Sequence, residues 1–79
     1  MPYTDDSEYP FRAPHSHRYK TVARIDPADH RRLKRFIEDR PELRLLGIED
    51  NLPDQWGVHV GCASERVRDD FDEWVYNTL

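Results

Sequence analysis

The sequence predicts one small α+β domain, in which a three-stranded antiparallel sheet carries two helices on one face and follows a flexible N-terminal arm. Three observations predict this fold. Two segments alternate along the chain with the two-residue period of β-strands. Two others repeat apolar residues at three- and four-residue spacing, as amphipathic helices do. The chain has only 79 residues, so these elements have to share a single core.

The first 17 residues are predicted to be the arm, and residues 18–79 the domain. Pro2, Pro10 and Pro14 lie in this stretch, which shows no apolar period. Each proline fixes its own φ and removes a backbone donor, so regular structure is disfavoured.

Residues 18–25 are predicted to form the first strand, because their side chains alternate between two faces and include β-branched types. One face carries Tyr19, Thr21, Ala23 and Ile25, and the other carries Lys20, Val22 and Arg24. A helix follows. Asp26 is a suitable N-cap, and Pro27 suits the first helical position, where its missing donor costs nothing. The apolar stripe of this helix is Leu33, Phe36 and Ile37. We expect the helix to end near Asp39, since Pro41 disfavours helical geometry at Arg40.

Residues 43–49 and 56–63 are predicted to pair as a hairpin. The segment Leu45-Leu46-Gly47-Ile48 fits either a buried strand or a short helical turn. The segment after it favours a strand, because a turn-rich cluster at 51–54 leads into the clearest alternation in the chain. The apolar side of that alternation is Trp56, Val58, Val60 and Cys62.

The final helix is predicted to begin after Ser64, which is a good N-cap. Its apolar stripe is Val67, Phe71, Trp74 and Val75. The predicted order is therefore β-α-β-β-α, and one sheet face covered by both helices would bury all the apolar stripes.

Charge is distributed unevenly along the chain. The net charge of −4 divides into −2 over residues 1–17, +4 over residues 18–40 and −6 over residues 41–79. Such asymmetry suggests that at least one face meets a charged partner.

The leading candidate surface is acidic. Four carboxylates at helical spacing, Glu65, Asp69, Asp72 and Glu73, form a stripe beside Tyr76, and Glu49, Asp50 and Asp54 lie at the hairpin turn. Carboxylates on a rigid surface resemble a row of phosphates, so they can occupy a basic groove that normally holds nucleic acid. The alternative is a helix face kept charged for solubility, in which Arg66 and Arg68 pair with Asp70 and Asp72.

The second candidate surface is the basic first helix, with Arg31, Arg32, Lys34 and Arg35. These side chains suit phosphate binding, which defines the alternative function of a small RNA- or DNA-binding accessory protein. Arg35 and Asp39 at i, i+4 would neutralise part of this patch. The negative net charge also argues against a dedicated nucleic-acid binder, so no strong direct nucleic-acid binding is expected.

Neither a metal or cofactor nor catalysis is predicted. His15-Ser16-His17 and the run from Asp69 to Glu73 each lack a complete ligand set. Cys62 and His59 are three residues apart on one strand, so they point to opposite faces and cannot act as a nucleophile and its base. A cysteine on the apolar side behaves as a small buried hydrophobe.

The cellular setting is expected to be the cytoplasm. A single cysteine excludes an internal disulfide and fits a reducing compartment. Residues 1–6 carry two acids and no apolar run, which is unlike a signal peptide. No stretch approaches the roughly 18 apolar residues of a membrane span.

In its short length, its carboxylate stripe at Glu65, Asp69, Asp72 and Glu73, and its lack of a catalytic set, the chain resembles the phage-encoded anti-CRISPR inhibitors as a class. The resemblance is one of overall profile and transfers no individual residue's role. It implies a protein that blocks a CRISPR surveillance complex by competing with target DNA. The expected partner is thus a protein with a basic nucleic-acid-binding groove, and the oligomeric state stays open.

Overall fold

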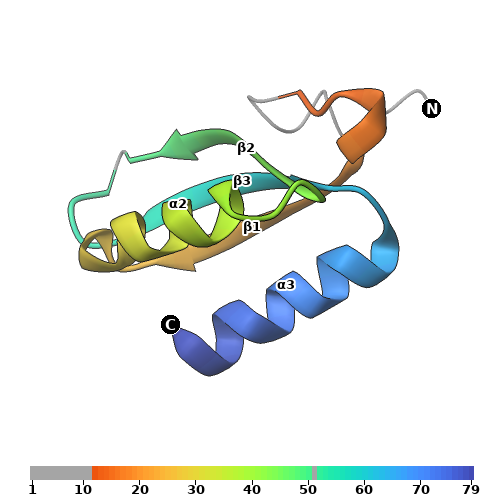
Figure 1. Cartoon of the computed structure of the whole chain (residues 1–79). Coiled ribbons are helices and arrows are strands. Elements are labelled where there is room, and N and C mark those ends of the chain that lie inside the picture. The colour runs from red at the N-terminus through yellow and green to blue at the C-terminus, as the bar shows by residue number, and fades with distance from the viewer. Residues whose placement is uncertain (1–11, 51) are drawn as a thin grey trace.

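The computed structural model of the protein describes residues 12–50 and 52–79 (Figure 1). Residues 1–11, which make up most of the predicted arm, lie outside the described residues, as does Asn51 of the predicted turn. The remainder of the predicted arm contains a short 3-10 turn, η1 (His15–His17), just before the first strand.

The predicted α+β fold with the order β-α-β-β-α is confirmed. The strands are β1 (Tyr19–Ile25), β2 (Leu43–Glu49) and β3 (Trp56–Cys62), and the helices are α2 (His30–Glu38) and α3 (Glu65–Thr78). All strand pairs are antiparallel, and the order across the sheet is β1-β3-β2. The hairpin of β2 and β3 therefore places β3 in the middle, with β1 and β2 as the two edges.

The N-caps expected from the sequence are formed. The Asp26 carboxylate accepts from the backbone N–H of Ala28 at 2.9 Å, and the Ser64 hydroxyl oxygen accepts from the N–H of Val67 at 3.2 Å. Each cap satisfies a donor at the start of a helix, which has no partner within the helix. The first turn after Asp26 differs from the prediction in type, because Pro27–Asp29 is a 3-10 turn, η2, and the α-helix begins at His30.

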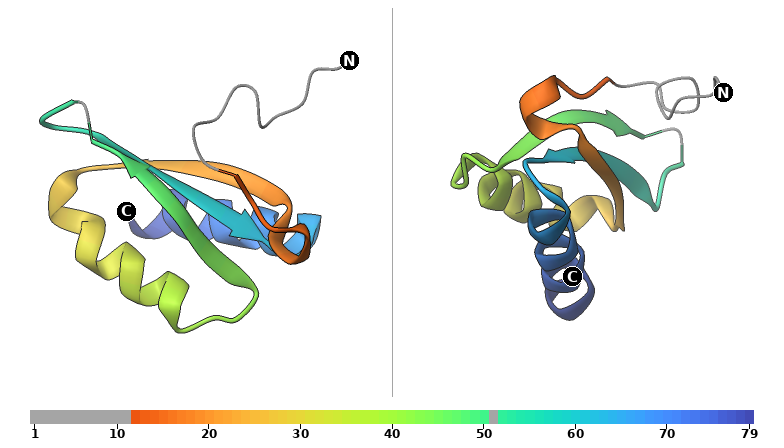
Figure 2. Two further views of the ribbon diagram at one scale, coloured as in Figure 1. Left: turned by 90° about the horizontal axis from the view of Figure 1, so that it is seen from above. Right: turned by 90° about the vertical axis from the view of Figure 1, so that its right-hand side faces the viewer.

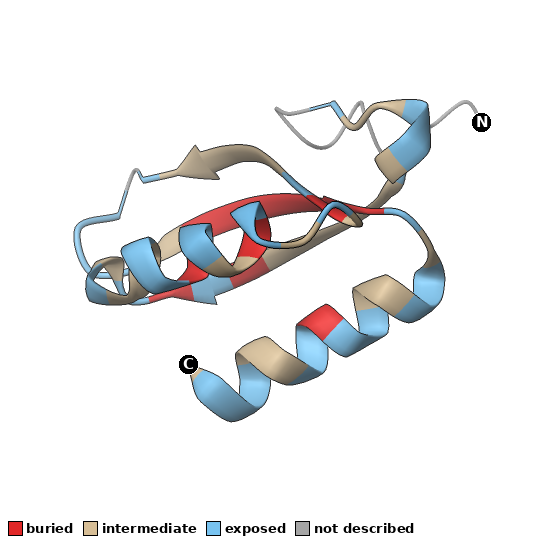
Figure 3. Cartoon of the chain, viewed as in Figure 1, coloured by how far each residue is buried: buried red, intermediate tan, exposed pale blue. Residues whose placement is uncertain are grey.

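Both helices cover the same face of the sheet, where the core lies (Figures 1 and 3). From β3 the core takes Val58, Val60 and Cys62, each at most 1% exposed. Helices α2 and α3 also meet each other, since the rings of Phe36 and Trp74 stack with centroids 3.7 Å apart. The guanidinium of Arg40 lies 3.7 Å from the centroid of the Phe36 ring, so a cation shields the solvent end of the stack.

The opposite face of the sheet is also partly covered. The turn η1 lies on that side (Figure 2), and a Cβ atom added at Gly61 would meet the backbone oxygen of His17 at 2.6 Å. The His17 ring in turn donates from Nε2 to the carbonyl oxygen of Pro41 at 2.9 Å. All residues of β3 from Gly57 to Cys62 are buried, so both faces of this strand are covered.

No helix in the described part of the chain is long and apolar enough to cross a membrane.

Candidate interaction surface

The acidic stripe of α3 follows directly from how this helix is anchored. Phe71 is 2% exposed and is joined in the core by the half-buried Val67 and Trp74. Since successive residues turn by about 100° around a helix, the positions opposite Phe71 must face solvent. These positions include Glu65, Asp69, Glu73 and Tyr76, all of which are exposed. Tyr76 is 88% exposed, which leaves almost the whole ring in water.

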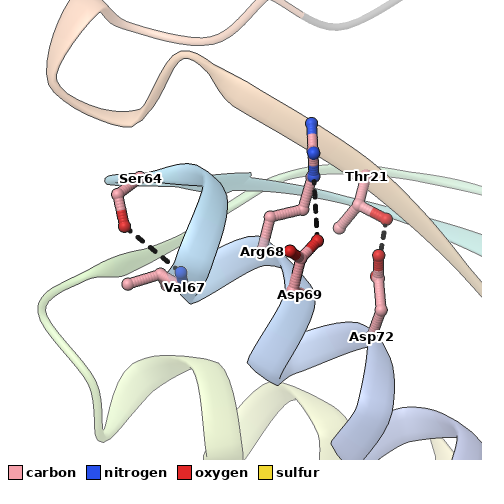
Figure 4. A network of polar contacts seen from close by, with 6 residues as sticks. All are labelled: Thr21, Ser64, Val67, Arg68, Asp69 and Asp72. Atoms are coloured by element: carbon pink, nitrogen blue, oxygen red, sulfur yellow. Dashed lines mark hydrogen bonds and ion pairs between the residues drawn. The ribbon is translucent and has the colours of Figure 1, made fainter.

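The acids of the stripe differ in how tightly they are held (Figure 4). The Thr21 hydroxyl donates to Asp72 Oδ1 at 2.8 Å, so Asp72 links α3 to β1. Arg68 Nε lies 3.8 Å from Asp69 Oδ1, and the Asp69 side chain is 73% exposed. An ion pair so long and so exposed contributes little. Arg68 thus approaches Asp69, whereas the solubility hypothesis expected it beside Asp72.

Of the three predicted hairpin acids, Glu49 does not share a surface with the α3 stripe. Asp50 and Asp54 are exposed near the hairpin turn. Glu49, however, faces the side of the sheet away from α3, because it pairs with Gly57 and its Oε1 is 3.5 Å from where a Gly57 Cβ would lie. There it accepts from Nε2 of His59 at 2.7 Å.

The His59–Glu49 contact was not found from the sequence. His59 is 3% exposed and is the only buried polar or charged residue in the described part of the chain. Its partner depends on the register of β2 and β3, which shifts between Leu45 and Gly47. A bulge of this kind leaves Leu46 unpaired and changes which side chains meet, and the isolated Gly47 inside the strand is the sequence signal that could have marked its position.

The basic residues predicted on the first helix are found on the exposed side of α2. Arg31, Arg32 and Arg35, together with Ala28, line an open hollow of about 420 Å³. Lys34 is also exposed. Within residues 12–50 and 52–79 none of these four bases has a carboxylate oxygen within 4.0 Å, so the expected Arg35–Asp39 pair is not formed.

The groups considered for metal binding and catalysis are dispersed. His15 is exposed, while His17 accepts from the Ser16 hydroxyl at 2.9 Å in addition to its bond with Pro41. The described residues contain no group of three or more side chains placed to hold a metal ion. Cys62 is fully buried on the core side of β3, and burial, with a smaller contribution from Asp72, raises the pKa of its thiol to about 11. Such a thiol is almost entirely protonated at neutral pH and is a poor nucleophile.

A second feature adjoins the acidic stripe, a crevice of about 460 Å³ between β1 and the C-terminal half of α3. Val22 and Arg24 line it from the strand, and Val75, Tyr76 and Leu79 line it from the helix end. This crevice was not predicted from the sequence, because it lies between β1 and α3, which are far apart in the chain.

Comparison of the chain with protein-family models, with curated proteins and with solved structures found no match.

Proposed function

We propose that this protein is a non-enzymatic inhibitor that docks the acidic stripe of α3 on the basic, nucleic-acid-binding groove of another protein. The observation that carries the proposal is the line of exposed carboxylates Glu65, Asp69 and Glu73 beside the exposed ring of Tyr76. A large aromatic left in water among charges is typical of residues that anchor protein interfaces.

The spacing of these charges suits a groove made for nucleic acid. Glu65, Asp69, Asp72 and Glu73 fall within an axial rise of about 12 Å, at about 1.5 Å per residue. That is one charge per about 4 Å, close to the roughly 3.4 Å per charge along one strand of B-DNA. Helix α3 holds five acidic and two basic residues, so its net charge of −3 keeps the phosphate-like character.

A phosphate-like stripe would act by competition. A basic groove attracts the stripe through the same long-range field that attracts nucleic acid, so both ligands would meet the groove at high association rates. Occupancy by the protein would exclude the nucleic acid. A CRISPR surveillance complex, the target implied by the anti-CRISPR resemblance, is one partner with such a groove.

The second candidate function is direct binding of RNA or DNA by α2. The observation that favours it is the hollow bordered by Arg31, Arg32 and Arg35, which have no carboxylate partner in the described part of the chain. Three such guanidiniums are able to contact phosphates. The net charge of −4 opposes this function, because the rest of the surface repels a polyanion.

Two charge-reversal variants separate the two functions. The double variant Asp69→Lys, Glu73→Lys reverses two of the four charges of the stripe without touching the Asp72–Thr21 bond. Both positions are exposed, as are the two positions of the control. The control Arg31→Glu, Arg35→Glu changes the net charge by the same amount in the opposite direction. Each tagged variant is checked for folding by circular dichroism and then used to capture partners from a lysate of the source organism.

We expect the α2 variant to retain the captured partners and the α3 variant to lose them. Added duplex DNA should release the partners from the wild-type protein, since both would occupy one groove. Recovery of every partner by the α3 variant and of none by the α2 variant would show that the acidic stripe is not the functional surface.

A further inference from the structure

Among the described residues, the outer edge of β1 is not paired with another strand. In this part of the chain β1 is an edge strand whose one neighbour in the sheet is β3. A strand paired on one side presents a row of backbone N–H and C=O groups on the other, which is a template for another strand. None of the described elements pairs with this side of β1, and the two views of Figure 2 show no described strand beside it.

The crevice beside β1 would give an added strand somewhere to place its side chains. The Thr21–Asp72 bond ties the strand to the helix at one point. Beyond that point the crevice of about 460 Å³ opens. The apolar side chains of Val75 and Leu79 are half-buried there, and the nearly fully exposed ring of Tyr76 borders it.

The charges around the edge specify what such a strand should carry. The crevice is lined by one acid, Asp72 of the acidic stripe on α3, and by one base, the exposed Arg24, which strand alternation directs toward the other face of β1. Side chains of a strand alternate between faces. A complementary strand would therefore place basic and apolar side chains toward α3 and acidic side chains toward Arg24.

A second copy of this chain does not meet this requirement. Residues 18–25 contain three bases, Arg18, Lys20 and Arg24, and no acid. Antiparallel pairing of two β1 strands would bring like charges close to each other, which is how natural sheets discourage edge-to-edge association.

We propose that an extended segment of a partner protein adds to β1 as a fourth strand, with basic and apolar side chains in the crevice between β1 and α3. The proposal rests on the function proposed above and specifies how the basic partner is held. Main-chain hydrogen bonds to β1 would supply affinity, and the crevice and its charges would supply specificity, as in other cases of strand addition.

The test uses the full ¹⁵N-labelled chain and a defined probe, the acetylated and amidated peptide Lys-Glu-Val-Thr-Lys-Glu-Val-Thr. In an extended conformation this peptide shows lysine and valine on one face and glutamate and threonine on the other. We expect bound peptide to slow hydrogen exchange at alternate amides of β1 and to shift the resonances of Val75 to Leu79. The same peptide with all backbone nitrogens methylated should do neither, because it has no N–H groups to pair.

A pair of neighbouring variants supplies the control within the protein. Tyr76 and Asn77 are both exposed, but of the two only Tyr76 lines the crevice. Tyr76→Ala should weaken peptide binding about tenfold, as expected for the loss of an aromatic anchor. Asn77→Ala should leave the affinity within about twofold of wild type, since it contacts no bound side chain.

Three results would overturn strand addition. One is the absence of peptide binding at millimolar concentration. Another is a set of resonance shifts confined to α3, with β1 amides that exchange as fast as without peptide. That result would mean that charge alone holds the partner, and the proposed function would still stand. The third is protection of β1 amides without peptide at high protein concentration, which would assign the edge to a second copy. Failure of the proposed function is detected separately. In that case the variant Asp69→Lys, Glu73→Lys captures the same partners from the lysate as the wild-type protein does.

Discussion

A single methyl group added at Gly61 is expected to destabilise the protein, whereas the same change at Gly57 is not. Both glycines lie on β3, four residues apart, so both face the side of the sheet away from the helices. At Gly61 a Cβ atom would lie 2.6 Å from the backbone oxygen of His17. At Gly57 the nearest atom is Nη1 of Arg24 at 3.3 Å, the end of a flexible side chain.

The magnitude follows from which neighbour is able to move. Relief of the Gly61→Ala clash requires η1 to shift as a unit, and overpacking of this kind costs about 1–3 kcal/mol. The lower entropy of the unfolded alanine chain returns about 0.4–1 kcal/mol in either variant. We therefore expect Gly61→Ala to lose about 1–2 kcal/mol, and Gly57→Ala to be neutral or slightly more stable.

Thermal unfolding monitored by circular dichroism is the assay. In a domain of this size 1 kcal/mol corresponds to about 4–8 °C in Tm, so a loss of about 1–2 kcal/mol should make Gly61→Ala melt about 4–16 °C below Gly57→Ala. Equal melting temperatures, or a lower value for Gly57→Ala, would refute the placement of η1 on the sheet face over β3.

Three further predictions concern the core, Cys62 and nucleic acid. Trp74→Ala should cost about 3 kcal/mol in urea unfolding, because it removes the Phe36 stack and opens the core; an unchanged unfolding midpoint would mean that this face of α3 is misplaced. Since the pKa of Cys62 is raised from 9.0 to about 11 in the folded chain, ionisation favours the unfolded chain at high pH. Stability should fall by about 2 kcal/mol between pH 9 and 11 relative to Cys62→Ala, and parallel pH profiles would contradict this. Titration with duplex or single-stranded DNA at roughly 150 mM salt should show no binding tighter than about 10 µM, and sub-micromolar binding would favour the α2 function.

The sequence was sufficient to predict the fold because most elements carry their own local signal, and the ambiguous segment that forms β2 was assigned from the turn and strand that follow it. Alternation marks β1 and β3, and the caps Asp26 and Ser64 mark where helical structure begins. These signals depend on residues close together in the chain, which is where pattern analysis is strongest.

Contacts between elements that are distant in the chain could not be predicted from the sequence. Glu49 was grouped with the α3 acids because charge was counted along the chain, yet strand alternation turns it toward His59 on the other face of the sheet. The bulge at Leu46 likewise depends on the register of β2 and β3, and the crevice beside Tyr76 on the packing of α3 beside β1. The α3 stripe was predicted more successfully, because all its members belong to one helix whose period is fixed.

Competition with nucleic acid tests the central claim most directly. The measurement is fluorescence anisotropy of a labelled duplex bound to a captured partner, titrated with this protein. Wild type should displace the duplex, with a midpoint that rises with salt because exposed charges are screened. The variant Asp69→Lys, Glu73→Lys should not displace it, while Arg31→Glu, Arg35→Glu should displace it at least as well as wild type. Displacement by the α3 variant at wild-type concentrations would contradict the claim that the acidic stripe occupies the partner's nucleic-acid groove.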